Sequence, residues 1–262
     1  MTFAVAPPDA TTTPSGSKLR VILVGIGGAS SSGKTTLAKH LRNIVPGSMI
    51  LHQDDFAPPQ ELIPIHPEHN VQDWDAAEGA IEWPRMRDSL RDVKRTGHIP
   101  PEHYSHDHLN TQKGVPIKPE IMQRWKAKFS EVDADRKKHG EQLLWVMVDG
   151  FLLYWDMDVV DTLDVRILLR APHDTLQARR ETRNGYHTAE GGFWKDPPKY
   201  WEQIVWPAYV AAHRGIVENG DVERGKSNGK VESLEIIEGL EKTMDETVEF
   251  VCEKMLEVVT SS

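Results

Sequence analysis

The chain is poor in cysteine and lacks any long apolar run. Cys252 is the one cysteine among 262 residues, which excludes an intramolecular disulfide and fits a reducing compartment. No stretch reaches the length needed to cross a bilayer, and the first 18 residues lack the pattern of a targeting signal. We therefore expect a cytosolic or nuclear protein that has no membrane partner and buries Cys252 in its core.

Basic residues are also in the minority. The 40 acidic residues outnumber 31 basic ones, and the formal net charge is -9. This balance argues against general binding to nucleic acid phosphates and favours a small-molecule substrate. Apolar residues make up 39% of the chain, enough for the core of one α/β domain.

Composition along the chain indicates a single domain with a tail. Residues 6–17 are rich in Pro, Thr, Ser and Gly, so we expect residues 1–18 to be disordered and residues 19–262 to form one domain. Residues 95–140 are polar, carry five histidines, and show helical periodicity only around residues 121–129. We interpret this stretch as an insertion.

Apolar runs that alternate with helical patterns predict a parallel sheet. Strands are expected at residues 21–24, 48–52, 143–148 and 163–169, with helices after residue 35, over 75–94 and from 172. A final amphipathic helix is predicted from apolar residues three or four apart. Core packing is the favoured role of its stripe, and a membrane or partner surface is the alternative. The stripe comprises Ile236, Leu240, Met244, Val248, Val251, Met255 and Val258.

The most informative motif is G-x-x-x-x-G-K-T at residues 28–35, directly after an apolar strand. Glycines let the backbone curl around phosphates, the lysine reaches the β and γ phosphates, and the threonine hydroxyl binds Mg²⁺. The alternative is a loop that only turns the chain. The expected nucleotide contacts are Gly28, Ser30, Ser31, Ser32, Gly33, Lys34, Thr35 and Thr36.

Three acidic residues follow predicted strands, where the ligand crevice of a parallel sheet forms. Asp149 ends a strand in the manner of a Walker B acid and is a candidate Mg²⁺ ligand beside Thr35. Either Asp54 or Asp55 is placed to take a proton from a substrate hydroxyl. A helix cap or turn residue is the alternative for each.

Arginines gather at the end of the helix that begins near residue 172. Arg179 and Arg183 share one helical face, with Arg180 between them, so guanidinium groups are available to clamp a transferring phosphoryl group. An exposed arginine-rich helical turn is the alternative reading.

Together these motifs resemble the nicotinamide riboside kinases, relatives of uridine kinase and phosphoribulokinase among the P-loop kinases. The resemblance covers roughly residues 19–214. It implies a three-layer α/β/α fold of the nucleoside-monophosphate-kinase type, with a five-stranded parallel sheet and a lid near residues 179–200. It also implies phosphorylation of the 5′ hydroxyl of nicotinamide riboside, and often nicotinic acid riboside, by ATP with Mg²⁺. The motifs lie at residues 28–35, 53–56, 74–75, 149–153, 179–183, 196–200 and 205–207.

The resemblance also assigns roles to individual residues. Asp54 becomes the proton acceptor, and Thr35, Asp54 and Asp149 the residues that hold the metal. Asp75 is expected to bind the ribose hydroxyls with Arg180 as its partner, while Trp74 and Tyr186 cover the two faces of the nicotinamide ring. For Trp74, a core aromatic is an equal alternative. Arg179 and Arg183 match lid positions that contact ATP. The remaining substrate-side positions are Asp55, Phe56 and Asp196.

The chain departs from shorter family members in two stretches, residues 95–140 and 184–195. The first holds His98, His103, His106, Asp107 and His108. A zinc site is conceivable there, but a solvated loop is favoured because the spacing is not that of metal ligands. A uridine or cytidine kinase and a P-loop GTPase or nucleotide sensor remain alternatives, although no N-K-x-D motif is present. Adenine contacts near residues 220–226 and the oligomeric state stay unassigned.

Overall fold

A sheet of five parallel strands lies at the centre of the computed structural model, which describes residues 17–110, 114–183, 185–188 and 192–260. Residues 1–16 of the expected tail lie outside this description, and residue 18 already belongs to the first strand. The sheet has the order β2 (Met49–His52), β3 (Glu141–Gly150), β1 (Lys18–Gly27), β4 (Val165–Arg170) and β7 (Leu234–Glu238).

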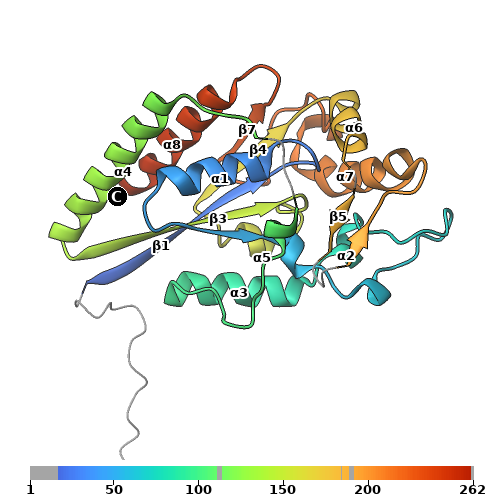
Figure 1. Ribbon diagram of the computed structural model, residues 1–262, viewed down its shortest axis with the longest axis horizontal. Coiled ribbons are helices and arrows are strands. Elements are labelled where there is room, and N and C mark those ends of the chain that lie inside the picture. Colours follow the sequence, from blue (N-terminus) through green and yellow to red (C-terminus); the bar gives the residue numbers. More distant parts are fainter. Residues whose placement is uncertain (1–16, 111–113, 184, 189–191, 261–262) are drawn as a thin grey trace, which may run out of the picture.

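Helices cover both faces of this sheet, and Figure 1 shows α1, α4 and α8 on the face opposite α3 and α5. The first face is covered by α1 (Lys34–Ile44), α4 (Pro119–Lys138) and α8 (Met244–Thr260). The other is covered by α2 (Ala77–Ala80), α3 (Trp83–Thr96), α5 (Met157–Val160), α6 (His173–Glu181) and α7 (Trp206–His213). The predicted three-layer α/β/α fold with a five-stranded parallel sheet is confirmed.

Short elements connect the layers. A two-stranded antiparallel hairpin, β5 (Tyr186–His187) and β6 (Phe193–Trp194), stands apart from the main sheet. A π-helical turn, η4 (Trp201–Val205), runs directly into α7. The 3₁₀ turns are η1 (Gln53–Phe56), η2 (Gln60–Leu62), η3 (Asp107–Leu109), η5 (Arg214–Ile216) and η6 (Glu218–Gly220). Among the described residues, no helix is both long and apolar enough to cross a bilayer.

Strand register determines which residues meet at the carboxyl edge of the sheet. Asp149 on β3 is aligned with Ile26 on β1 and with His52 on β2. The loop after β1, the acid on β3 and the turn after β2 therefore lie next to one another. The apolar cores on both faces keep these three strand ends in place.

Helix α4 occupies the second half of the segment interpreted as an insertion. Its buried Trp125 and Phe129 face the sheet, and the Phe129 ring meets the Trp145 ring edge-on at 5.5 Å between centroids. Figure 1 shows α4 running alongside α8. The sequence pattern over residues 121–129 predicted helix, and the structure extends it to 20 residues.

The C-terminal helix begins later than its apolar spacing predicts. Ile236 lies in β7, and Leu240 follows that strand with 57% of its surface exposed, so the expectation that both belong to the helix is wrong. The spacing of residues 236, 240 and 244 imitates helical periodicity across a strand and a turn. Thr243 and Glu246 instead form a capping box, in which each side chain accepts a hydrogen bond from the other's backbone N–H.

The helix predicted over residues 75–94 is also divided. α2 ends at Ala80, two residues in extended or irregular conformation follow, and α3 starts at Trp83. Pro84 is the reason, because proline lacks an N–H and fits the first turn of a helix rather than its interior.

The corrected boundary of α8 predicts unequal costs for two alanine substitutions. Met255→Ala should lower the free energy of unfolding by about 2 to 5 kcal/mol, because this side chain is fully buried. Leu240→Ala should change it by less than about 0.5 kcal/mol, since Leu240 lies exposed outside the helix. Urea unfolding of both variants measures the difference. Equal losses of unfolding free energy would contradict the exposed position of Leu240.

Candidate active site

The phosphate loop, residues 28–35, joins β1 to α1 and is shaped by two glycines. Gly28 has φ of 148°, and a Cβ there would lie 2.4 Å from the carbonyl oxygen of Leu169. Gly33 has φ of 100° and caps α1 in the left-handed region, which favours glycine. Ser30 is half-buried on the turn between them. The loop thus brings the positive end of a helix to the carboxyl edge of the sheet.

Polar groups in this loop are buried and turned inward. The hydroxyl oxygens of Ser31 and Ser32 have no hydrogen-bond partner among the described residues, although they are shielded from solvent. Lys34 is 9% exposed. Arg179, at the end of α6, donates a hydrogen bond from Nη1 to the Ser31 carbonyl oxygen at 3.3 Å. The loop therefore holds several hydrogen-bond donors suited to phosphate. These are the two unpaired hydroxyls, the buried Lys34 ammonium group and the Arg179 guanidinium group.

The acid at the end of β3 is ionised in this setting. Burial opposes ionisation of Asp149, but hydrogen bonds from His52 and Thr35 and the charge of Lys34 hold its pKa below the usual range. His52 Nδ1 lies 3.1 Å from Asp149 Oδ2. Asp149 Oδ1 is buried and has no hydrogen-bond partner among the described residues. A carboxylate oxygen left open beside a threonine hydroxyl fits the oxygen ligands that Mg²⁺ prefers.

The two adjacent acids in η1 have different surroundings. Asp54 is exposed to solvent on one side. Protein surrounds the rest of its carboxyl group and reduces its hydration, which raises its pKa, although the charge of Lys34 acts in the opposite direction. Asp55 is buried, accepts a hydrogen bond from the backbone N–H of His106 at 3.0 Å, and lies 3.5 Å from His103 Nε2. Asp55 is therefore engaged with protein, whereas Asp54 is available to a ligand.

The histidine-rich part of residues 95–140 packs against the site. The His103 ring lies 5.0 Å from the ring of Phe56, which is fully buried. Asn110 accepts from the backbone N–H of His187 at 2.8 Å and donates to its carbonyl oxygen at 3.3 Å. This stretch thus links η1 to the β5–β6 hairpin. In the part of the chain that the structure describes, no group of three or more His, Cys, Asp or Glu side chains is placed to hold a metal ion.

A second group of charges lies between α2 and the hairpin. Arg180 donates to Asp196 from Nε at 2.6 Å and from Nη2 at 3.1 Å, and its Nη1 lies 3.9 Å from Asp75 Oδ1. Trp194 Nε1 donates to Asp196 at 2.9 Å. Asp75 Oδ2 is buried with no hydrogen-bond partner among the described residues. Burial raises the pKa of Asp75 to about 6, although the Arg180 charge opposes this.

The aromatic residues are arranged differently from a simple sandwich of Trp74 and Tyr186. The ring next to Trp74 is Trp194, at 5.8 Å between centroids. Tyr186 faces the guanidinium groups of Arg180, at 5.0 Å, and Arg183, at 5.4 Å. The structure therefore brings Tyr186 to the lid arginines and places a second tryptophan, which the sequence analysis did not single out, beside Trp74.

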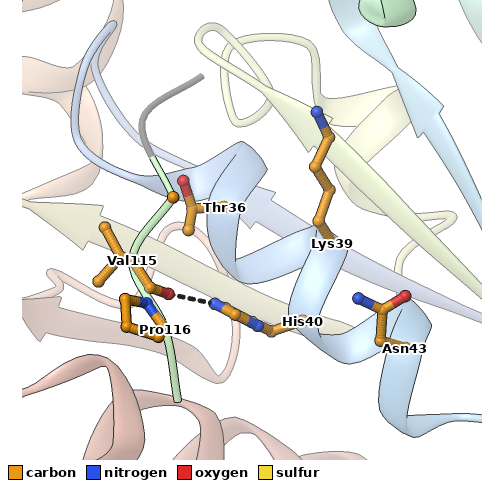
Figure 2. A pocket seen from close by; sticks show the side chains of 7 residues that line it. Thr36, Lys39, His40, Asn43, Val115 and Pro116 are labelled. Carbon is orange, nitrogen blue, oxygen red and sulfur yellow. Dashed lines mark hydrogen bonds between the residues drawn. The ribbon is translucent and has the colours of Figure 1, made fainter. Parts of the chain in front are cut away.

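A pocket of about 400 Å³ continues past the phosphate loop along α1. Figure 2 shows Thr36 and His40 facing residues 114–116 across it, with His40 Nε2 hydrogen-bonded to the Val115 carbonyl oxygen at 2.7 Å. Residues 220–226, whose contacts with the adenine stayed unassigned from the sequence, lie beside the end of β4. The carbonyl oxygen of Gly225 accepts from Arg170 Nη1 at 2.6 Å, at the end of β4.

Sequence reasoning missed three residues that contact the site. His52 precedes the Q-D-D-F motif and closes β2, and its position at a strand end was the available signal. Trp194 and Asn110 carry no such signal, because their contacts depend on how the hairpin folds over the sheet. Charge interactions nevertheless join Lys34, Asp54 and Asp149, so these three residues lie close to one another.

A phosphate loop, a strand-end acid, an exposed carboxylate and an arginine of α6 at one sheet edge define a P-loop kinase of small molecules. Comparison with known proteins makes this specific, and the chain belongs to the nicotinamide riboside kinase family. It is 37% identical to the nicotinamide riboside kinase of Schizosaccharomyces pombe, over 78% of this chain and 84% of that one. It is 31% identical to the nicotinamide riboside kinase of Saccharomyces cerevisiae, over 91% of this chain and 97% of that one.

More distant relatives agree with this placement. Human nicotinamide riboside kinase 2 is 29% identical over 76% of this chain and 70% of its own. No protein-family model matches the chain. A solved Janibacter sugar kinase aligns with 90% of this chain and 94% of its own at 16% identity and a TM-score of 0.39, too low a likeness to bear on the fold.

The pKa of Asp75 predicts a pH-dependent gain in stability for Asp75→Asn. The unfolded carboxyl releases its proton near pH 3.8, whereas the folded protein retains it up to about pH 6. As pH rises through this interval, the free energy of unfolding of the wild type should therefore fall relative to that of the variant. The difference should reach about 2 to 3 kcal/mol at pH 7.5. Urea unfolding without ligands tests this. The advantage of Asp75→Asn should vanish near pH 4, and a variant less stable than wild type at pH 7.5 would contradict the assignment.

Proposed function

We propose that this chain transfers the γ phosphate of ATP to the 5′ hydroxyl of nicotinamide riboside, and also accepts nicotinic acid riboside, as a cytosolic or nuclear enzyme of NAD salvage. Membership of the family supports the reaction. The observation that carries the proposal is the meeting of the phosphate loop, the open Asp54, the buried Asp75–Arg180 pair and the half-buried Asp196 at one edge of the sheet.

The donor phosphates belong to the loop and the lid. Backbone N–H groups and the hydroxyls of Ser31 and Ser32 would bind the β and γ phosphates, with Lys34 beside them. Arg179 already reaches the loop, and Arg183 lies just beyond the end of α6, with its guanidinium group over the Tyr186 ring. Their guanidinium groups would stabilise the charge on the transferring phosphoryl group.

Thr35, Asp149 and Asp54 would hold the magnesium ion. The open Oδ1 of Asp149 and the neighbouring Thr35 hydroxyl fit this role. Few protein ligands are needed, because Mg²⁺ bound with a nucleotide keeps several waters and takes phosphate oxygens. When bound, the ion supplies charge neutralisation at the β and γ phosphates.

The acceptor riboside would lie between η1 and the hairpin. Asp75 and Asp196 accept hydrogen bonds from the ribose hydroxyls, and the tryptophan pair Trp74 and Trp194 offers π faces to the cationic pyridinium ring. The 5′ oxygen attacks the γ phosphorus, the bond from this phosphorus to the β–γ bridging oxygen breaks, and ADP leaves. Asp54 takes the hydroxyl proton.

Two asparagine substitutions separate the neighbouring acids of η1. Asp54→Asn should lower kcat about 100-fold or more, as expected for loss of a general base, with little change in ATP affinity. Asp55→Asn should lower kcat less, because Asp55 is bonded to the histidine-rich stretch. Steady-state kinetics of both variants, each checked for native thermal unfolding, measure the ranking. A greater loss in Asp55→Asn would overturn the choice of base.

Substrate identity is tested through Trp74 and Asp75. Contact of a cationic ring with an indole is worth about 1 to 2 kcal/mol, so Trp74→Ala should raise KM for nicotinamide riboside roughly tenfold and for uridine less. Asp75→Ala should impair both ribosides, since ribose hydroxyls lose their acceptor. Kinetics with the two ribosides provide the comparison. If Trp74→Ala raised KM equally for the two ribosides, or if the wild type preferred uridine, the chain would instead be a pyrimidine nucleoside kinase.

A further inference from the structure

His52 is placed to control the orientation of Asp149. It is the last residue of β2 and the register partner of Asp149 on β3. Its Nδ1 lies 3.1 Å from Asp149 Oδ2, and the two side chains are only 11% and 4% exposed. The contact is therefore shielded from water and selects one of the two carboxylate oxygens.

A second carboxylate lies near the opposite edge of the imidazole ring. His52 Nε2 lies 3.9 Å from Asp107 Oδ2, and the same oxygen lies 2.8 Å from Lys39 Nζ. Asp107 comes from η3 in the histidine-rich stretch and Lys39 from α1. The hydrogen bond at Nδ1 sets the direction of the ring toward Asp149, and the charge of Asp107 near Nε2 favours the same orientation.

This arrangement leaves the second oxygen of Asp149 for another partner. Oδ1 is buried and no described residue hydrogen-bonds to it, while the Thr35 hydroxyl interacts with the same carboxylate. A buried carboxylate oxygen without a partner is costly. A divalent cation satisfies it, because Asp and Thr oxygens form a hard ligand set.

We propose that His52 is a positioning residue that engages Asp149 Oδ2 and thereby holds Oδ1 toward the divalent cation bound with the nucleotide. The inference rests on the proposed function, in which Asp149 binds that cation. Partners of this kind, bonded to a metal ligand rather than to the metal, typically alter metal affinity by about 10 to 100-fold when removed. Asp107 supports His52 from the other side.

Binding of a non-hydrolysable ATP analogue tests the proposal without turnover. Calorimetry gives the Kd of adenylyl imidodiphosphate with Mg²⁺ and with a chelator, and the ratio of the two reports the contribution of the cation. His52→Leu should reduce this ratio about tenfold or more and leave the Kd in chelator within about twofold. His52→Asn, whose amide can donate from near the Nδ1 position, should retain most of the ratio. His139→Leu, at an exposed site after α4, is the matched control and should equal wild type.

The outcomes separate this proposal from the function on which it rests. An unchanged ratio in His52→Leu, together with a lost ratio in Asp149→Asn, would overturn the role of His52 alone. A ratio that survives Asp149→Asn would overturn the metal assignment and the role of His52 with it. If His52→Leu weakened binding of the ATP analogue equally in chelator and in Mg²⁺, His52 would have a general structural role. That result would also overturn the proposal.

Discussion

The structure depends on placing several carboxylates at one edge of the sheet and offsetting their mutual repulsion. Asp54 interacts electrostatically with both Asp149 and Asp75, and the latter two carboxyl groups are buried. Lys34 offsets the charge near the phosphate loop, and Arg180 offsets it near Asp75 and Asp196. Asp149 Oδ1 and Asp75 Oδ2 are among the buried carboxylate oxygens that still lack a hydrogen-bond partner among the described residues. The site therefore carries unsatisfied negative charge that a metal ion and sugar hydroxyls are suited to satisfy.

The fold makes this concentration possible. Parallel pairing aligns the ends of β1, β2 and β3, so that one edge receives the phosphate loop, the Asp149 carboxylate and η1 together. Apolar cores on both faces of the sheet hold these strand ends in position. The hairpin and the histidine-rich stretch close the site from two sides and meet through Asn110 and His187. Stability lost at the site, as at Asp75, is offset by burial elsewhere.

Sequence reasoning succeeded where a local pattern has one structural solution. A phosphate loop requires glycines and a lysine at fixed spacing, and four strands were predicted from short apolar segments. It failed at β7, because Ile236 and Leu240 continue a helical spacing by coincidence and only the Thr243 capping box marks the true helix start. Partners that meet through tertiary folding were also out of reach. Trp194 beside Trp74, and Asp107 facing His52, join segments far apart in the chain.

The central claim is tested most directly by identifying the product formed from competing acceptors. Wild-type protein would be incubated with ATP, Mg²⁺ and equal amounts of nicotinamide riboside and uridine, and the products identified by mass spectrometry and phosphorus NMR. We expect nicotinamide mononucleotide, with its phosphate on the 5′ oxygen, as the main product, and one ADP released for each mononucleotide formed. Predominant uridine monophosphate, or ADP released at the same rate without any riboside, would contradict it.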